Sequence, residues 1–328
     1  MRTQSRGSGS YVVAVLAACA AASSGCGGAG GSVAQGSTAA TTTSAPSDCA
    51  VTLHLAWPES LSAQVTGEDL TESSAADGSA PMRGLSPSDL KARVRGDATG
   101  WTIGFEVAGR TRVRSQGFAP ELGGVRPVVH IARDGQVDRV TGADAMAAGV
   151  RAWLAAGQID GDTAAMVSVN ATDAAQLDNA RAHWEWMTRV WNGRSMRCGE
   201  PVRETAPVPA MVFSPSRLTA DLTLTYVGPS PCPGGRGGTC ATLVLNEVAR
   251  PDSIRDALRA QMRPGDPITS GTLERRVELV VEPDTLVPHA VTFDERVTIT
   301  RGPGGPENVR LVHDQQAYRF AYRTAGAL

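Results

Sequence analysis

The sequence is short of lysine, of aromatic residues and of long apolar runs. Lys91 is the only lysine among 31 basic residues, so the chain cannot supply the second lysine that penicillin-interacting enzymes need. The match of Ser88-Asp89-Leu90-Lys91 to their S-x-x-K motif is therefore a coincidence. Aromatic residues make up 5% of the chain, so its core must consist mainly of Val, Leu, Ile and Ala. After residue 30 no stretch approaches about eighteen consecutive apolar residues, and we expect no membrane-spanning helix there.

The common motifs for cofactors, metals and catalysis are also missing. The sequence contains no G-x-x-x-x-G-K-[ST], no H-E-x-x-H and no G-x-S-x-G. Gly25-x-Gly27-x-x-Gly30 has neither a strand before it nor a helix after it, so it is not a dinucleotide fingerprint. Arg95-Gly96-Asp97 falls in an expected turn, where Gly and Asp are favoured for backbone reasons. We therefore expect no catalytic residue, no cofactor and no metal ligand.

Charge argues against nucleic acid as a partner. The formal net charge is −2 for the whole chain. It becomes −4 once the N-terminal segment, which contains Arg2 and Arg6 and no acidic residue, is removed. A mildly acidic protein of mixed charge lacks the basic surface that binds phosphate backbones.

The first 26 residues have the pattern of an export signal. Arg2 and Arg6 precede a short apolar run at residues 11–16, which gives way to small residues and to Cys19 and Cys26. Residues 27–48 contain almost nothing bulky and apolar, which predicts a flexible tether. A signal, a cysteine and a Gly/Ser/Thr tether in this order resemble a secreted bacterial lipoprotein. The resemblance implies export and an N-terminal lipid anchor in the cell envelope, on the outer surface of a membrane or at its periplasmic face.

Two cysteines compete as the site of lipid attachment. Cys19 ends the lipobox-like Leu16-Ala17-Ala18-Cys19 and has leucine at the −3 position. Cys26 has a poorer −3 residue, but cleavage before it leaves an even number of cysteines for disulfides. An ordinary secretory signal without lipid is the third interpretation.

The remainder of the chain alternates between apolar and polar residues with the period of β-strands. Trp101, Ile103, Phe105 and Val107 share one face of an expected strand, and Asp134-Gly135 predicts a tight hairpin. Three helices are expected, at residues 144–156, 173–193 and 252–262. This order predicts an antiparallel α+β fold with a large, curved, half-barrel-like sheet.

Domain boundaries are less sharply marked. Residues 199–209 contain three prolines and little apolar content, which favours a linker between lobes at 49–198 and 210–328. The two lobes can equally form one domain. The polar residues 66–89 predict a surface loop or a disordered insert.

The helix expected at residues 173–193 carries a continuous apolar stripe. The stripe contains Leu177, Ala180, Trp184, Met187 and Trp191, which we expect to pack on the sheet. Trp186 lies off this stripe, so it is either buried by wide packing of the helix or available to a groove or a partner.

Four cysteines in the body suit an oxidising compartment. Cys232 and Cys240 bracket a glycine-rich loop between two expected antiparallel strands, which favours a disulfide. A metal site is the alternative there, but the spacing is not that of metal ligands and no histidine is near in the sequence. Cys49–Cys198 follows by elimination.

Three functions remain open. The leading hypothesis is a non-catalytic binding or carrier module for an apolar small molecule or lipid of the envelope. The expected architecture looks like the half-barrel carriers that move lipids or lipoproteins across the periplasm, although no motif carries that likeness. The second hypothesis is an envelope hydrolase, in which His130 or His313 meets a nucleophile or a carboxylate from a distant strand. The third is a structural or assembly lipoprotein that binds another envelope protein through an exposed apolar face.

Overall fold

A computed structural model describes residues 49–74, 82–107, 128–157, 172–209, 217–233, 238–261, 268–301 and 309–322. The export signal and the tether lie outside these residues. The lipid attachment at Cys19 or Cys26 therefore stays a prediction.

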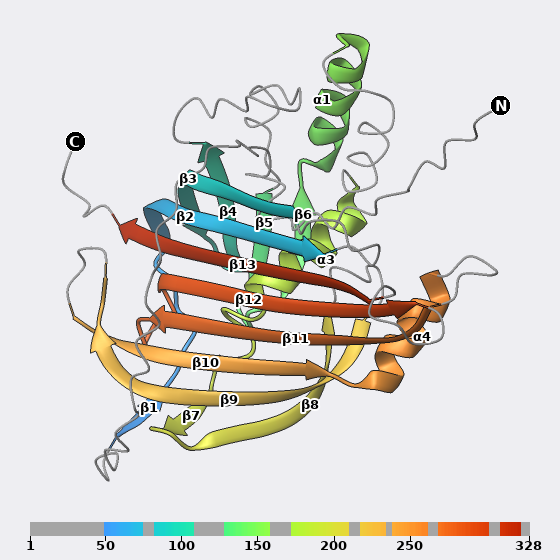
Figure 1. Cartoon of the computed structure of the whole chain (residues 1–328). Coiled ribbons are helices and arrows are strands. Elements are labelled where there is room, and N and C mark those ends of the chain that lie inside the picture. The colour runs from blue at the N-terminus through green and yellow to red at the C-terminus, as the bar shows by residue number, and fades with distance from the viewer. Residues whose placement is uncertain are drawn as a thin grey trace, which may run out of the picture.

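One antiparallel sheet of eleven strands dominates the structure (Figure 1). Its strand order is β6-β5-β4-β3-β2-β13-β12-β11-β10-β9-β8, and neighbours along the chain are mostly neighbours in the sheet. The strands are β2 (Ser60–Ser74), β3 (Met82–Gly96), β4 (Gly100–Val107), β5 (Val128–Ala132), β6 (Val137–Thr141), β8 (Pro201–Pro209), β9 (Arg217–Pro231), β10 (Thr239–Ala249), β11 (Ile268–Val281), β12 (Pro288–Arg301) and β13 (Val309–Tyr322). Three helices of the described residues accompany them: α1 (Ala143–Ala155), α3 (Asp173–Trp184) and α4 (Pro251–Gln261). The α+β fold with a mostly antiparallel, curved sheet is confirmed.

Sheet curvature brings both edge strands to the same helix. β6 and β8 are the two edges of the sheet, and α3 contacts both of them. In Figure 1, α3 lies behind the central strands, on the concave face of the sheet, while α4 covers the far end of the sheet against β9 and β11. The concave face is therefore buried, and its inward residues repeat with the strand period of two, as in Leu61, Ala63 and Val65 of β2.

The proline-rich residues 199–209 form an edge strand rather than a linker. β8 pairs with β9 from Pro201 to Pro209. Its three prolines stand an even number of residues apart, so their missing N–H groups all fall along one side of the strand and leave the other side free for pairing. The proline ring excludes a further neighbour on that side, which suits an edge. Strands from both suggested lobes join in this one sheet.

Much of the expected loop at residues 66–89 is also strand. β2 pairs with β3 over Ser60–Ser73 and with β13 over Ala63–Ser74. Backbone hydrogen bonds to the strands on both sides hold this polar segment in the sheet. It therefore forms a strand without the alternation of apolar and polar residues that would have predicted one.

A second, two-stranded sheet ties the start of the body to the end of the segment that follows α3. β1 (Ala50–Thr52) pairs with β7 (Ser195–Arg197). The Cys49–Cys198 disulfide lies at the end of this ladder, with the two Cα atoms 5.5 Å apart.

Candidate functional site

The concave face is crossed by a segment that is fastened to both edges of the sheet. We call residues 173–194, which comprise α3 and the turns after it, the crossing segment. At one edge, Arg181 Nε donates to the backbone oxygen of Val137 in β6 at 3.1 Å. At the other edge, the guanidinium of Arg194 contacts both carboxylate oxygens of Glu204 in β8 at 2.9 and 2.7 Å. The segment thus spans the opening of the curved sheet.

The helix in the crossing segment is shorter than the sequence predicts. α3 ends at Trp184, and backbone hydrogen bonds of mixed spacing continue from there, such as Met187 N to Trp184 O and Val190 N to Glu185 O. The indole N–H of Trp191 donates to the Trp186 backbone oxygen at 2.7 Å, which stabilises the tighter turns. Four residues of the apolar stripe, from Ala180 to Trp191, are nevertheless buried, while Leu177 is half-buried against the core. Trp186, at 3% exposed, is buried as well.

Aromatic rings from the sheet and the crossing segment meet at one end of the concave face. The ring of Trp57 lies 6.0 Å from that of Trp101 and 5.9 Å from that of Trp184. Both sheet-side indoles are hydrogen-bonded: Trp101 Nε1 donates to the Trp57 backbone oxygen, and Trp57 Nε1 to that of Leu286, each at 2.9 Å. The indole positions are therefore fixed by directional contacts as well as by packing.

An apolar hollow lies beside these rings. It has about 320 Å³ of empty space, much of it open to solvent, and the enclosed part has room for little more than a water molecule. Ten residues line it: Trp57, Leu61, Ala63, Ala92, Val94, Ile103, Trp184, Pro288, Phe320 and Tyr322. None of them is charged, so the hollow suits an apolar group. Its enclosed part is far smaller than small-molecule sites, which enclose about 300 to 1,000 Å³, and an apolar ligand enters only if a lining ring moves.

A buried ion cluster lies on the same face, further along the strands. Arg275 of β11 stands directly between Glu247 of β10 and Glu295 of β12 in the strand register. Its guanidinium donates to Glu247 at 2.9 Å and to Glu295 at 2.9 Å. The guanidinium carbon also lies 3.7 Å from the ring centre of Trp186, so the crossing segment covers the cluster.

The ion cluster carries one more acid than base. Burial raises the pKa of Glu247 from 4.5 to about 7, an effect that Arg275 opposes and Glu295 reinforces. With both carboxylates ionised the cluster has a net charge of −1, which is costly where water is excluded. Glu247 therefore titrates near neutral pH.

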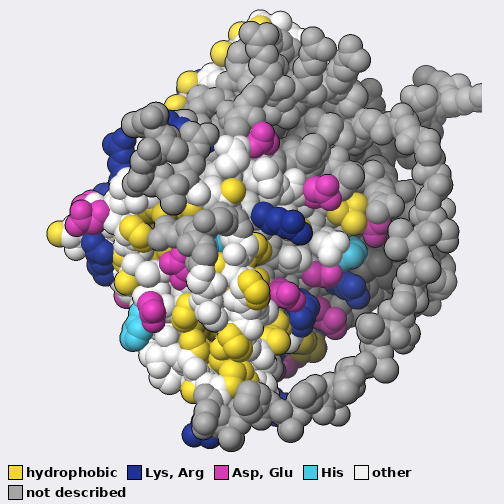
Figure 2. All heavy atoms as spheres, turned by 90° about the vertical axis from the view of Figure 1, so that its left-hand side faces the viewer, with side chains coloured by type: hydrophobic (Ala, Val, Ile, Leu, Met, Phe, Trp, Pro, Cys, Tyr) yellow, Lys and Arg dark blue, Asp and Glu magenta, His cyan; other side chains and the backbone are white. Residues whose placement is uncertain are grey.

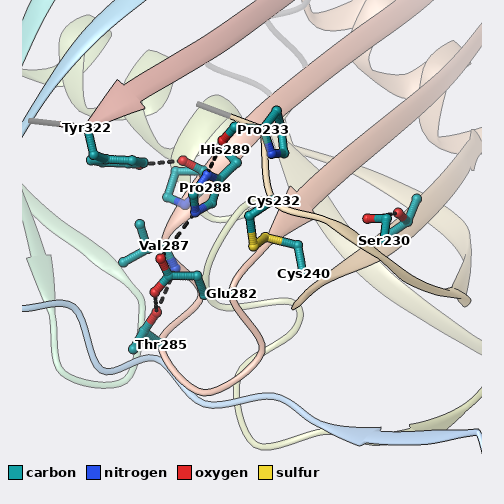
Figure 3. Close-up of a disulfide and its surroundings, with 11 residues drawn as sticks. Ser230, Cys232, Pro233, Cys240, Glu282, Thr285, Val287, Pro288, His289 and Tyr322 are labelled. Atoms are coloured by element: carbon teal, nitrogen blue, oxygen red, sulfur yellow. Dashed lines mark hydrogen bonds and ion pairs between the residues drawn. A yellow bond between two sulfur atoms is a disulfide. The ribbon is translucent and has the colours of Figure 1, made fainter. Parts of the chain in front are cut away.

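Both expected disulfides are present, and one of them lies beside a histidine. Cys232 and Cys240 are joined at the β9–β10 hairpin, with their Cα atoms 5.0 Å apart. Figure 3 shows His289 of β12 next to this disulfide, between the backbone oxygen of Pro233 and the carboxylate of Glu282. His289 is far from both cysteines in the sequence and becomes their neighbour only through the fold.

His130 has part of a hydrolytic arrangement. Its Nδ1 lies 2.6 Å from Asp138 Oδ1, and its Nε2 lies 3.3 Å from the hydroxyl of Thr99. That hydroxyl donates its single proton to Asp97 Oδ1 at 2.6 Å, so it is not poised to give the proton to His130. Asp97 also accepts from the Thr99 and Gly100 backbone N–H groups, and the Thr99 contacts lower the pKa of Asp97. The Arg95-Gly96-Asp97 turn thus uses its aspartate to hold its own backbone.

His313 lies in a cluster of charged side chains. Its Nε2 is 3.2 Å from Asp294 Oδ1, and its Nδ1 is 3.6 Å from Glu72 Oε2. Arg296 contacts the same Asp294 at 3.4 Å. Alternation along β13 places His313 on the sheet face opposite to that of the buried Asp314, away from the apolar hollow.

Exposed apolar side chains are few in the part of the chain that the structure describes. Val227 and Val248 are the large ones, and their places near opposite ends of β9 and β10 keep them apart. Figure 2 shows the end of the molecule at which β13 ends. Hydrophobic side chains there lie in separate patches with charged ones between them. Among the described residues, Val227 and Val248 are thus the large apolar side chains that are most exposed.

No family model and no curated relative matches the sequence. A solved structure on lipid–protein interactions in lipovitellin is similar at 9% identity and a TM-score of 0.40, over 83% of this chain and 26% of that chain. This chain thus spans about a quarter of that protein's length. A likeness this low carries no functional argument.

Among the described residues, no helix is long and apolar enough to cross a membrane. The two disulfides indicate an oxidising compartment outside the cytoplasm.

Proposed function

We propose that this protein is an exported, lipid-anchored envelope protein that binds an apolar chain between its curved sheet and the crossing segment. The apolar hollow is the observation that carries the proposal. It is lined by ten uncharged side chains drawn from five neighbouring strands (β4, β3, β2, β13 and β12), from the crossing segment and from Trp57 just before β2.

The size of the hollow limits the ligand or requires motion. The free space is small, so only a group about the size of a water molecule fits as the structure stands. A longer acyl chain needs Trp184 to swing away from Trp57, and these rings meet edge to face at 5.9 Å without a hydrogen bond between them. The crossing segment then acts as the movable wall of the site, and Arg181 and Arg194 hold it to the two edges of the sheet.

The anchor is part of the same proposal. The signal, Cys19 or Cys26 and the tether at residues 27–48 support attachment to a membrane, with the body held a tether's length away. A protein held near a bilayer is well placed to take up or deliver an apolar envelope component.

Filling the hollow tests the proposal. Ala63 lines the hollow and is 3% exposed, whereas its neighbour Ser62 points to the other face of β2. We expect Ala63→Leu to weaken binding of a fluorescent fatty acid by at least about tenfold, because the added carbons occupy the space of the ligand. Ser62→Leu is the matched control and should leave affinity within about twofold. Equal affinities in the two variants would place any binding elsewhere.

A further inference from the structure

The disulfide at the β9–β10 hairpin and its neighbouring histidine bring three metal-ligating side chains together. One ligand atom from each of Cys232, Cys240 and His289 lies within 4.8 Å of the other two. Cys240 and His289 are 1% and 0% exposed. Within the described residues this is the one such group of three, and the Cys49–Cys198 pair has no comparable third ligand.

The imidazole of His289 is already held as metal-binding histidines usually are. Its Nε2 lies 3.1 Å from Glu282 Oε1 (Figure 3), and a carboxylate behind the ring is the common partner of a histidine ligand. Thr285 in turn donates to Glu282 Oε2 at 2.9 Å and fixes that carboxylate. The other ring nitrogen, Nδ1, lies 2.5 Å from the backbone oxygen of Pro233, the residue that follows Cys232. Nδ1 therefore faces the cysteine loop.

We propose that reduction of the Cys232–Cys240 disulfide creates a binding site for a thiophilic d¹⁰ metal ion such as Zn²⁺. Cys232, Cys240 and His289 Nδ1 are its three protein ligands, and Glu282 orients the imidazole through Nε2. A dithiol reductant supplies two electrons and two protons and becomes a disulfide itself, while the protein disulfide becomes two thiols. Metal binding then releases both thiol protons to solvent, and Nδ1 of His289 exchanges its contact with the Pro233 backbone oxygen for the metal and coordinates in its unprotonated form.

The geometry is close to what such a site requires. With Zn–S bonds of about 2.3 Å and Zn–N bonds of about 2.0 Å, neighbouring ligand atoms in a tetrahedral site lie about 3.5–3.8 Å apart. The sulfurs must separate after reduction, and because the ligand atoms already lie within 4.8 Å of one another, the imidazole needs to approach by no more than about 1 Å.

The site borders the apolar hollow without sharing its ligand. Pro288, which lines the hollow, precedes His289 in β12, and the Tyr322 ring, which also lines it, lies 5.2 Å from the His289 ring. Metal binding is therefore expected with or without an apolar ligand, so its test is separate from that of the proposed function.

Cobalt and zinc titrations of the full chain, reduced with a phosphine, test the inference. Co²⁺ bound by thiolates in a tetrahedral site gives a sulfur-to-metal charge-transfer band and strong visible bands. We expect these bands at one equivalent in the wild type and in Cys49→Ser/Cys198→Ser, and not in Cys232→Ser/Cys240→Ser. In competition with a chromophoric chelator, Glu282→Gln should weaken Zn²⁺ binding about 10- to 100-fold, as loss of a supporting carboxylate does elsewhere, and His289→Gln should weaken it more.

Two results would overturn the inference. One is the absence of a thiolate band in the reduced wild type. The other is equal binding by the two double-serine variants. X-ray absorption of the wild-type Zn²⁺ complex needs no variant to fold: two sulfur and one nitrogen neighbours support the site, and a shell without sulfur refutes it.

Discussion

The guanidinium of Arg275 and the carboxylate of Glu247 lie 2.9 Å apart in the interior of the concave face, and their side chains are only 2% and 0% exposed. They sit beneath Trp186 of the crossing segment and beside Glu295. The pair therefore couples the packing of the crossing segment to the state of a buried charge cluster.

Stability should fall as pH rises through neutrality. The pKa of Glu247 is about 7 in the folded protein against an ordinary value of 4.5, so the folded state holds the proton more tightly. This contribution is fully present below pH 4.5 and is lost as pH rises through 7. Between pH 5 and pH 8 we expect the free energy of unfolding, measured with urea, to drop by about 2 kcal/mol.

Substitution isolates this effect. Glu247→Gln should flatten the profile between pH 5 and pH 8, whereas Glu278→Gln, at an exposed site on the neighbouring strand, should leave it unchanged. The pKa values of Asp97 and Asp221 are lowered, so any stability they add is lost only in acid, below this window. A free energy of unfolding that rises from pH 5 to pH 8 would contradict the assignment.

Removing the cation from the cluster should be costly. Arg275→Met leaves Glu247 and Glu295 buried without their partner, and we expect a loss of about 3–5 kcal/mol in urea unfolding. Arg276→Met, whose arginine is half exposed on the other face of β11, should change stability by less than about 0.5 kcal/mol. Replacing all three charged residues of the cluster by apolar ones should recover most of the loss. Similar losses for the two single variants would argue against the cluster.

The two disulfides should differ in their contribution to stability. Cys49–Cys198 has a sequence separation of 149 and Cys232–Cys240 one of 8. In the loop-entropy estimate, removal of Cys49–Cys198 lowers the free energy of unfolding by about 5 kcal/mol, and removal of Cys232–Cys240 lowers it by about 2.6 kcal/mol. Urea unfolding of the two double-serine variants checks this order, and a larger loss for the short loop would show that the native contacts of the hairpin outweigh chain entropy.

Trp184 should control access to the hollow. Trp184→Ala removes the ring shared by the crossing segment and the hollow, so we expect longer fatty acids to bind more tightly while the protein loses about 3–5 kcal/mol of stability. Affinity for fatty acids of increasing length, measured by fluorescence, tests this. If the wild-type protein prefers long chains as strongly as the variant does, Trp184 does not limit the length of the fatty acid that binds.

Local signals in the sequence predict the parts of the fold that local forces decide. Asp134-Gly135 predicts a hairpin, and Gly135 indeed has a φ of 90° between β5 and β6. The alternation of Trp101, Ile103 and Phe105 predicts β4. Residues 199–209 were misread because their prolines suit either a linker or an edge strand, and only the pairing with β9 distinguishes the two.

The positions of the three buried charged residues in their strands could have predicted the ion cluster, although the overall composition of the chain does not indicate it. Glu247, Arg275 and Glu295 each occupy a position whose neighbours two residues away are mainly apolar and buried. Charged residues of opposite sign on the buried face of successive strands predict an ion cluster once the strand register is known. His289 had no such signal, because its proximity to Cys232 and Cys240 arises from the order of strands in the sheet.

Native mass spectrometry of the protein purified from its own membrane tests the central claim most directly. Our account predicts an apolar molecule that remains bound under gentle conditions, is lost on unfolding and is reduced in Ala63→Leu relative to Ser62→Leu. The same spectrum should show a lipid-modified N-terminus at Cys19 or Cys26. A protein that carries no ligand, takes up no added fatty acid and has a bare N-terminus would contradict both the apolar site and the anchor.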